Sequence, residues 1–425
     1  MNQKTSEKIK KRGFTGDAES IGVLSITTQT MNQTKYTVLT TCPDYGSRNV
    51  GDKLIEIRIK DLIEREIGPC EFLTIFREEP LDDSLEAINR TEAVLLPALP
   101  IRDTPMYPGT YRLVDDLSRI RPPLIPMGAN WNVYPGDEVT RDALEYSRAT
   151  VDFLRYLSSQ HPTFSCREFN VGRVLKKHGV ENGRFTGDPA MFNPRFLGQP
   201  MTLPESVDKL VFSPPLSAYY ADQGVRVLET LAEMFPQAER ICAFHLDDAG
   251  ISPDSASENS AAMRPEVAEK NRVIRERAKD LGYAIWQLGG DIEGMRHYET
   301  CDLHVGYECH AHMYFLSARR PSVLIAEDAR GYGFNQTLGV GAVTGFQRVA
   351  AARGTVRKTI TSGYCTSLSE LSFAPPAADA EMRVRQLLED EIETGFQRFA
   401  GLADYLDLIY ETRMQPFLRS LPGAG

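Results

Sequence analysis

Three short segments of the chain bring together residue types that can carry out chemistry. The first is the loop Asp44–Asp52, DYGSRNVGD, which follows an apolar run and precedes an amphipathic stretch. Its glycines allow tight turns, and the exposed N–H groups at the start of the following helix form a natural site for an anion. A simple turn, in which Asn49 or Asp52 caps the helix, is the alternative interpretation.

The second segment, Thr163–Phe192, combines charged residues with turn residues. The pair Arg167-Glu168 ends one predicted strand, and Asp188-Pro189 follows the next one. A local ion pair with a helix cap, and a simple turn, would account for these residues equally well. By itself this segment therefore does not identify a site.

The third segment, Tyr298–Gly331, has an apolar strand that runs into Glu308-Cys309-His310 and then into a helix of small residues. Polar residues between a strand and a helix are expected at the ligand-binding edge of an α/β sheet. His310 would lie at the positive end of the helix, which favours its neutral form. A structural histidine with satisfied hydrogen bonds is the alternative.

The cysteines and histidines of the third segment do not predict a metal centre. Alternation along a strand sends Cys301 and His304 to opposite faces, and the segment has no CxxC spacing of the kind that binds zinc. We therefore expect no metal site here.

The elements that must position these segments are short apolar runs separated by longer amphipathic stretches, such as the helix-like Asp52–Ile67, Val171–His178 and Glu266–Asp280. Alternation of this kind predicts two doubly wound α/β domains facing a cleft, with the ligand at the carboxyl ends of the strands. The predicted strands are Tyr36–Cys42, Glu71–Phe76, Ala93–Ala98, Pro123–Gly128, Thr163–Cys166 and Arg184–Gly187 in the first half, and Lys209–Phe212, Arg240–Phe244, Tyr283–Gln287, Leu303–Gly306 and Ser322–Ala326 in the second.

The chain divides into four predicted parts. Residues 1–35 are polar and lack the apolar stretch of a signal peptide, so we expect a mobile leader. Residues 36–200 and 206–375 are predicted as N-terminal and C-terminal Rossmann-like domains, because the Pro- and Gly-containing stretch Asn193–Glu205 is the best linker. Residues 376–425 contain amphipathic helices that we expect to pack across both domains.

Composition excludes several classes of protein. The chain has 425 residues, 42% of them apolar and 25% charged, as is typical of a globular protein. Its net charge of -10 argues against a nucleic-acid partner, which requires a basic surface. No segment approaches the ~18–20 continuous apolar residues of a membrane span. The scattered cysteines indicate thiols in a reducing compartment, so we expect a cytoplasmic protein.

Taken together, the three segments resemble the polysaccharide pyruvyl transferases over roughly residues 36–345. That family has an N-x-G-D-like turn after the first strand, which Asn49, Gly51 and Asp52 match. It also has an Arg-Asp pair, then a helix, then a strand that ends in D-P-A. Arg167-Glu168 and Asp188-Pro189-Ala190 are similar to that run, with Glu in place of Asp.

The second half of the resemblance lies around the third segment. The family has an R-x-H-A element that leads into a helix, followed by G-x-P, a strand and a lysine. Glu308-Cys309-His310-Ala311, Arg320-Pro321 and Arg330 fall in step with these motifs. The resemblance implies a fold like that of the GT-B glycosyltransferases, α/β with two Rossmann-like domains facing a cleft.

The resemblance also implies a reaction, in which the enolpyruvyl group of phosphoenolpyruvate is transferred to a sugar or glycoconjugate as a ketal. Phosphoenolpyruvate would be a co-substrate, without a metal or a bound organic cofactor. His310 would be the acid or a donor-binding residue, and Arg330, Arg167 and Arg320 would contact the donor. The residues expected on the acceptor side are Asn49, Gly51 and Asp52. Trp131, which follows a predicted strand, could stack on a sugar ring or simply pack.

The chain departs from the family at Glu308, which stands where the family has an arginine. Glu308 reverses the charge at the donor site, and it could act as a general base or hold a cationic substrate. A GT-B glycosyltransferase that uses a sugar nucleotide is therefore an alternative function, with its diphosphate on Arg319, Arg320 or Arg330. A non-catalytic binding protein on the same scaffold is another. Self-association of the chain stays open.

Overall fold

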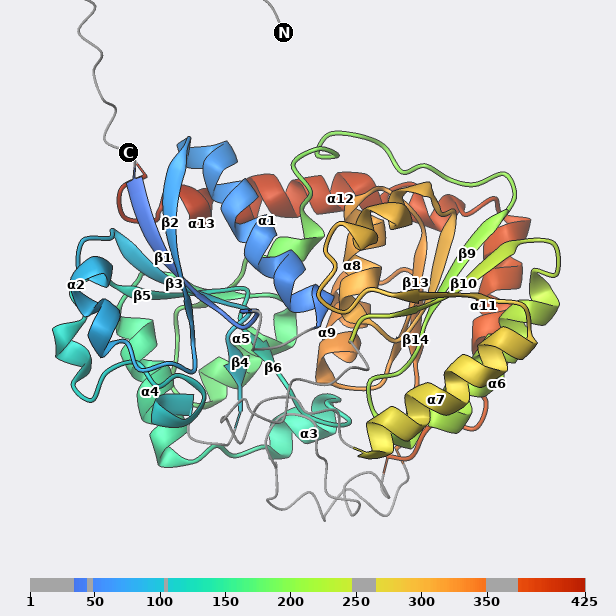
Figure 1. The fold of residues 1–425 in the computed structure, drawn as a ribbon, viewed down its shortest axis with the longest axis horizontal. Coiled ribbons are helices and arrows are strands. Elements are labelled where there is room, and N and C mark those ends of the chain that lie inside the picture. The colour runs from blue at the N-terminus through green and yellow to red at the C-terminus, as the bar shows by residue number, and fades with distance from the viewer. Residues whose placement is uncertain (1–33, 44–48, 103–105, 247–264, 349–373, 425) are drawn as a thin grey trace, which may run out of the picture. The chain divides into compact units, whose positions relative to one another are not determined.

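Two parallel β-sheets, one in each half of the chain, form the frame of the protein (Figure 1). The computed structural model describes residues 34–43, 49–102, 106–246, 265–348 and 374–424. The predicted leader up to residue 33, most of the loop Asp44–Asp52, Asp247-Asp248 and the loop Ile251–Met263 lie outside the described residues.

The first sheet has four strands in the order β2-β1-β3-β5, and every neighbouring pair is parallel. Two smaller parallel pairs, β4 with β6 and β7 with β8, extend the strand ends of this half. The bounds are β1 (Thr34–Thr40), β2 (Cys70–Phe76), β3 (Ala93–Pro97), β4 (Pro100–Ile101), β5 (Leu124–Met127), β6 (Asn130–Trp131), β7 (Phe164–Cys166) and β8 (Gly183–Phe185).

The second sheet has six strands in the order β11-β10-β9-β12-β13-β14, again all parallel. Counted within this half, the order is 3-2-1-4-5-6, the doubly wound order of a Rossmann fold. The bounds are β9 (Lys209–Ser213), β10 (Glu239–Phe244), β11 (Ala284–Gln287), β12 (Leu303–Gly306), β13 (Ser322–Ala326) and β14 (Ala342–Thr344).

Helices connect the strands, as a parallel sheet requires. α4 is representative, because Ser147 caps its start and Phe153, Leu154 and Leu157 form its buried face. The helices of the described residues are α1 (Val50–Ile67), α2 (Leu85–Ile88), α3 (Glu138–Ala143), α4 (Arg148–Ser159), α5 (Phe169–Lys177), α6 (Ala221–Met234), α7 (Pro265–Asp280), α8 (Cys309–Ser317), α9 (Ala329–Leu338), α11 (Ala380–Glu393), α12 (Leu402–Ile409) and α13 (Gln415–Arg419).

The C-terminal helices contact both halves of the chain. α11 packs against α6, and α13 packs against α1. Near the end of α1, Glu66 accepts hydrogen bonds from the Tyr410 hydroxyl at 2.5 Å and from Arg419 Nε at 3.0 Å. The α/β class with two parallel sheets and C-terminal helices, predicted from the sequence, is confirmed. The exact domain boundaries stay predictions.

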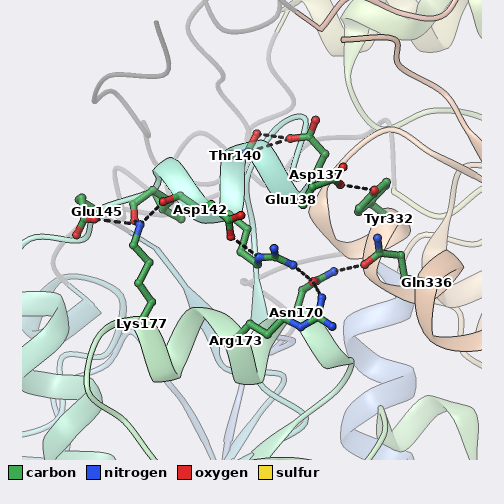
Figure 2. A network of polar contacts seen from close by, with 12 residues as sticks. Asp137, Glu138, Thr140, Asp142, Glu145, Asn170, Arg173, Lys177, Tyr332 and Gln336 are labelled. Carbon is green, nitrogen blue, oxygen red and sulfur yellow. Dashed lines mark hydrogen bonds and ion pairs between the residues drawn. The ribbon is translucent and has the colours of Figure 1, made fainter. Parts of the chain in front are cut away.

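Polar contacts link the two halves around α3, α5 and α9, as Figure 2 shows. The Tyr332 hydroxyl donates to Glu138 Oε2 at 2.5 Å, and Asn170 Nδ2 donates to Gln336 Oε1 at 2.8 Å. In addition, Arg348 forms an ion pair with Asp137 at 2.5 Å. The first two bonds tie the starts of α3 and α5 to α9, and the ion pair ties the start of α3 to the segment after β14.

Two glycines allow the halves to approach each other closely. A Cβ atom on Gly51, in the first turn of α1, would lie 1.9 Å from His310 Nδ1 of α8. A Cβ atom on Gly333, in α9, would lie 2.4 Å from Glu168 Cδ, at the start of α5. No other residue fits at either position without a shift of the neighbouring side chain.

We predict that Gly333→Ala destabilises the protein by about 1–3 kcal/mol, because the new methyl group overlaps the buried Glu168 side chain. Alanine has a higher helix propensity than glycine, so a decrease in the free energy of unfolding would come from the clash and not from helix propensity. Gly172→Ala is the matched control, since Gly172 also lies in a helix and its nearest neighbour, Gly183 O, is 4.0 Å from the added Cβ. Urea unfolding measures both variants, and equal stability changes would refute the proposed close contact.

Candidate functional site

A polar pocket lies at the carboxyl ends of the strands of the first sheet. In the order β2-β1-β3-β5 the direction of winding reverses between β1 and β3, which opens a crevice at their ends. Thr41, directly after β1, and Ala98, directly after β3, both line the pocket. The pocket is therefore at the position where an open parallel sheet binds its ligand.

Four arginines surround this pocket. Arg77 follows β2, Arg102 follows β4, Arg167 follows β7, and Arg330 lies in the first turn of α9. The remaining lining residues are Thr41, Asp52, Ile55, Pro97, Ala98, Pro100, Asn130, Asn132 and His310. Asp52, Arg167, His310 and Arg330, which come from three segments far apart in the sequence, are thus brought together. Guanidinium groups at this density are suited to a phosphate or a carboxylate.

Arg167 is almost completely buried, with 1% of its surface exposed. Its Nε lies 3.1 Å from Asp188 Oδ2, and its guanidinium stacks on the Phe334 ring at 4.5 Å. Asp188 is fixed in turn, because its Oδ1 accepts a hydrogen bond from the backbone of Ala190 at 2.8 Å. Arg167 Nη2 has no hydrogen-bond partner among the described residues. A buried donor of this kind in a pocket indicates a ligand that accepts from it.

His310 is another buried pocket residue with an unsatisfied atom, since its Nε2 has no hydrogen-bond partner in the described part of the chain. Burial, together with Arg167 and Arg330, holds the pKa of this imidazole well below its ordinary value. The lowered pKa favours the neutral form of His310. The ring packs against Gly51 at the start of α1.

The Asn49 and Gly51 positions have structural roles at the start of α1. Asn49 Oδ1 accepts a hydrogen bond from the Gly51 N–H at 2.8 Å, so Asn49 caps the helix. Gly51 leaves room for His310, and Asp52, in the same turn, lines the pocket. The structure thus realises the capping alternative for Asn49 and leaves Asp52 at the site.

Glu308 and Arg330 are the charged residues of the second half that the sequence predicts at the site, and Arg330 acts electrostatically on Glu308. Arg330 donates to Asp328 Oδ2 from Nε at 2.8 Å and from Nη2 at 2.5 Å. Glu308 precedes α8, and burial raises the pKa of its carboxyl to about 7, although Arg330 and Lys270 act in the opposite direction. A carboxyl that titrates near neutrality is suited to proton transfer.

Besides Asn49 and Gly51, three predicted site residues do not line the pocket, namely Glu308, Arg320 and Trp131. Arg320 donates to the backbone carbonyl of Glu299 at 3.1 Å and lies 3.8 Å from Asp302. Trp131 is 1% exposed in the apolar core of the first half, so it packs and is not a platform for a sugar ring. Its neighbours Asn130 and Asn132 line the pocket instead, because alternate residues of an extended chain point to opposite sides.

Arg77 and Arg102 are pocket residues that the sequence analysis did not identify. Arg77 directly follows the predicted strand Glu71–Phe76, so the rule that ligands bind after strand ends could have found it. Arg102 follows β4, a strand of two residues that gives no periodic signal. The described cysteines, histidines and carboxylates contain no group of three or more placed to hold a metal ion. Within the described helices, none is long and apolar enough to cross a bilayer.

Comparisons with known proteins give likenesses of structure only, because no protein-family model and no curated protein sequence matches the chain. A UDP-GlcNAc 2-epimerase from Neisseria meningitidis bound to UDP-GlcNAc is similar at 10% identity and a TM-score of 0.43, over 89% of this chain and 99% of that one. A putative UDP-N-acetylglucosamine 2-epimerase from Listeria monocytogenes gives 10% identity and 0.45, over 88% and 94%. A variant of the wall teichoic acid polymerase TagF gives 12% and 0.39, over 91% and 90%.

We predict that Glu308→Gln changes how stability depends on pH. The folded-state pKa of Glu308, about 7, lies above its ordinary value of 4.5. Between these values the folded protein holds a proton that the unfolded chain has lost, so this group lowers stability as pH rises through the window. Urea unfolding from pH 4.5 to 8 should show wild type losing stability relative to the variant up to about pH 7. Parallel curves would contradict a raised pKa.

Proposed function

We propose that the chain is a carbohydrate-active transferase of the pyruvyl transferase type, which binds phosphoenolpyruvate in the pocket and transfers its enolpyruvyl group to a sugar or glycoconjugate. The observation that carries the proposal is the meeting of Arg77, Arg102, Arg167 and Arg330 with His310 in one pocket. Phosphoenolpyruvate has a phosphate and a carboxylate, and arginines bind both groups through paired N–H donors.

The reaction requires one proton donor and one proton acceptor. The methylene carbon of phosphoenolpyruvate takes up a proton and becomes a methyl group, while a sugar hydroxyl oxygen bonds to the neighbouring carbon and loses its proton. A second hydroxyl oxygen then replaces the phosphate, which leaves with the carbon–oxygen bonding pair and takes up the proton of that hydroxyl, and this closes the ketal.

The charges at the site support an assignment of these proton transfers. Glu308, with a pKa of about 7, can hold a proton near neutrality and deliver it to the methylene carbon. His310 is neutral because its pKa is lowered, so it is a better acceptor for the hydroxyl proton than a donor. This assignment exchanges the two roles expected from the sequence. It also accounts for a glutamate at the position of the family arginine, since the first half supplies Arg77, Arg102 and Arg167 as cations.

A sugar-nucleotide glycosyltransferase is the second candidate, and one observation favours it. The second sheet has the 3-2-1-4-5-6 order, and its direction of winding reverses between β9 and β12. Nucleotides bind at such a point in many doubly wound sheets. The diphosphate would then lie near Glu308, which follows β12, with Arg330 as the neighbouring cation.

We predict that the protein binds phosphoenolpyruvate in the micromolar range in a calorimetric titration at low salt. Arg330→Ala should weaken binding about 10- to 100-fold, since a charge-assisted hydrogen bond contributes roughly 1.5–3 kcal/mol. Arg320→Ala is the matched control, an arginine of the same half that lies outside the pocket. It should bind like wild type.

The outcomes separate the two candidates. Binding of UDP-GlcNAc without binding of phosphoenolpyruvate up to millimolar concentration would replace the pyruvyl transferase proposal with the glycosyltransferase one. Equal losses in Arg330→Ala and Arg320→Ala would mean that the ligand binds elsewhere in the second half.

A further inference from the structure

A chain of buried hydrogen bonds begins at the backbone of Glu308 and crosses three strands of the second sheet. The Glu308 N–H donates to Ser213 Oγ at 3.1 Å, and Ser213 Oγ lies 2.8 Å from His304 Nε2. His304 Nδ1 lies 2.8 Å from Ser322 Oγ, which lies 2.7 Å from His312 Nδ1. The serines and His304 are 0% exposed, and His312 is 1% exposed.

This series of hydrogen bonds crosses the second sheet at its switch point, the place where the direction of winding reverses. Ser213 ends β9 and His304 belongs to β12, the two neighbouring strands between which the winding reverses. Ser322 begins β13 and pairs in register with His304. His312 lies in α8, which begins directly after Glu308. The series of hydrogen bonds therefore joins the first turn of α8, through Glu308 and His312, to the sheet beneath it.

The need of each buried hydrogen for an acceptor favours one direction along this series of hydrogen bonds. Each hydroxyl has one hydrogen to donate, and burial holds the pKa of His304 well below its ordinary value, so this ring is neutral with one N–H. Ser213 Oγ accepts from the Glu308 N–H, and within the described residues His304 Nε2 is the acceptor that its own hydrogen can reach, so Ser213 donates to His304 Nε2. His304 then donates from Nδ1 to Ser322, and Ser322 donates to His312 Nδ1. The reverse direction would leave the Ser213 hydrogen buried without an acceptor, which costs free energy.

Glu308 differs from the other acidic residues that precede helices at this site. Glu168, Asp188 and Asp328 each use their carboxylate to accept a hydrogen bond from the backbone of the helix that follows. The Glu308 carboxylate makes no such bond to α8. Its backbone is held by Ser213 instead, and the carboxylate is thus left available at the end of β12.

We infer that Ser213 is a positioning residue, which holds the Glu308 backbone through a directed chain with His304, Ser322 and His312 and so leaves the Glu308 carboxyl for the substrate. The catalytic part of this inference rests on the proposed function. The direction of the chain, with the hydrogen on Nδ1 of His304 and on Nε2 of His312, holds whatever the substrate is.

The first experiment determines the two histidine tautomers in the full-length protein without ligand. Nitrogen-15 NMR of histidine-labelled protein at neutral pH should show His304 protonated at Nδ1 and His312 protonated at Nε2. The signals are assigned from their loss in His304→Gln and His312→Gln. A hydrogen on Nε2 of His304 would overturn the direction of the chain.

The second experiment tests the positioning of Glu308. Arg330, Lys270, Asp328 and Asp52 are the charged groups that act on this carboxyl, and none of them is altered in Ser213→Ala. Its titration, followed by carbon-13 NMR of labelled carboxyl groups with Glu308→Gln as the blank, should move from about pH 7 toward the ordinary value of 4.5, because the freed residue can turn to solvent. Ser317→Ala is the matched control, a buried serine of α8 whose hydroxyl donates to Tyr314 O at 2.9 Å.

An unchanged Glu308 titration in Ser213→Ala would overturn the positioning role. If that variant does not fold, Ser322→Ala serves in its place, and it should convert the single tautomer of His304 into a mixture; a single tautomer that persists would overturn the inference. With phosphoenolpyruvate as the donor, Ser213→Ala should lower kcat about 10-fold with little change in KM. Failure of phosphoenolpyruvate to bind would remove only this last readout, so the two proposals fail separately.

Discussion

The contact between α1 and α8 is the constraint on which the candidate site depends. Gly51 has no side chain, and this allows the start of α1 to press against the His310 ring. Asp52 and His310, from opposite halves of the chain, consequently line one pocket. The same contact buries His310, and burial is the main cause of its lowered pKa. A single close approach therefore determines both the geometry of the site and the charge state of one of its main groups.

Charge balance around the pocket follows from this burial. Arg167 is neutralised by Asp188, and Arg330 by Asp328, because an isolated charge is costly away from water. The pairing leaves Arg167 Nη2 without a hydrogen-bond partner within the described residues, so this donor still lacks an acceptor. An oxygen atom of a bound ligand could accept from it. This is the physical reason for proposing a substrate with a phosphate or carboxylate group.

The two sheets contribute different groups to the candidate site, each at the point where the winding of the sheet reverses. The first sheet places Thr41 and Ala98 at its switch point and surrounds them with arginines from neighbouring strand ends. The second sheet places Ser213 and Glu308 at its own, where a carboxyl with a raised pKa is held by its backbone. In the proposed reaction, the first half would therefore supply most of the cations for the anionic donor, and the second half would supply the groups for proton transfer. Helix α9 joins them, since Arg330 lines the pocket and also acts on Glu308.

Much of the fold could be predicted from the sequence, because the buried strands of a parallel sheet are short, continuous runs of apolar residues. Leu303–Gly306 and Ser322–Ala326 were predicted with the bounds that the structure shows, since both are fully buried runs between polar segments. The strands β4, β6 and β14 were not predicted, because two or three residues are too short for periodicity to register. β1 begins at Thr34, inside the predicted leader. Backbone pairing with β2 extends this strand beyond the apolar residues from which it was predicted.

The sequence by itself determined the α/β class and the three segments from which Asp52, Arg167, His310 and Arg330 come, because strand ends and helix starts are visible in local residue patterns. Only the tertiary structure decided that Arg77 and Arg102 join them, that Trp131 packs inward, and that Arg320 lies elsewhere. These outcomes depend on which strands are neighbours and which face a side chain occupies. Pairing between strands that are well separated in the sequence, such as β1 with β2 and β4 with β6, sets both, and no local pattern encodes it.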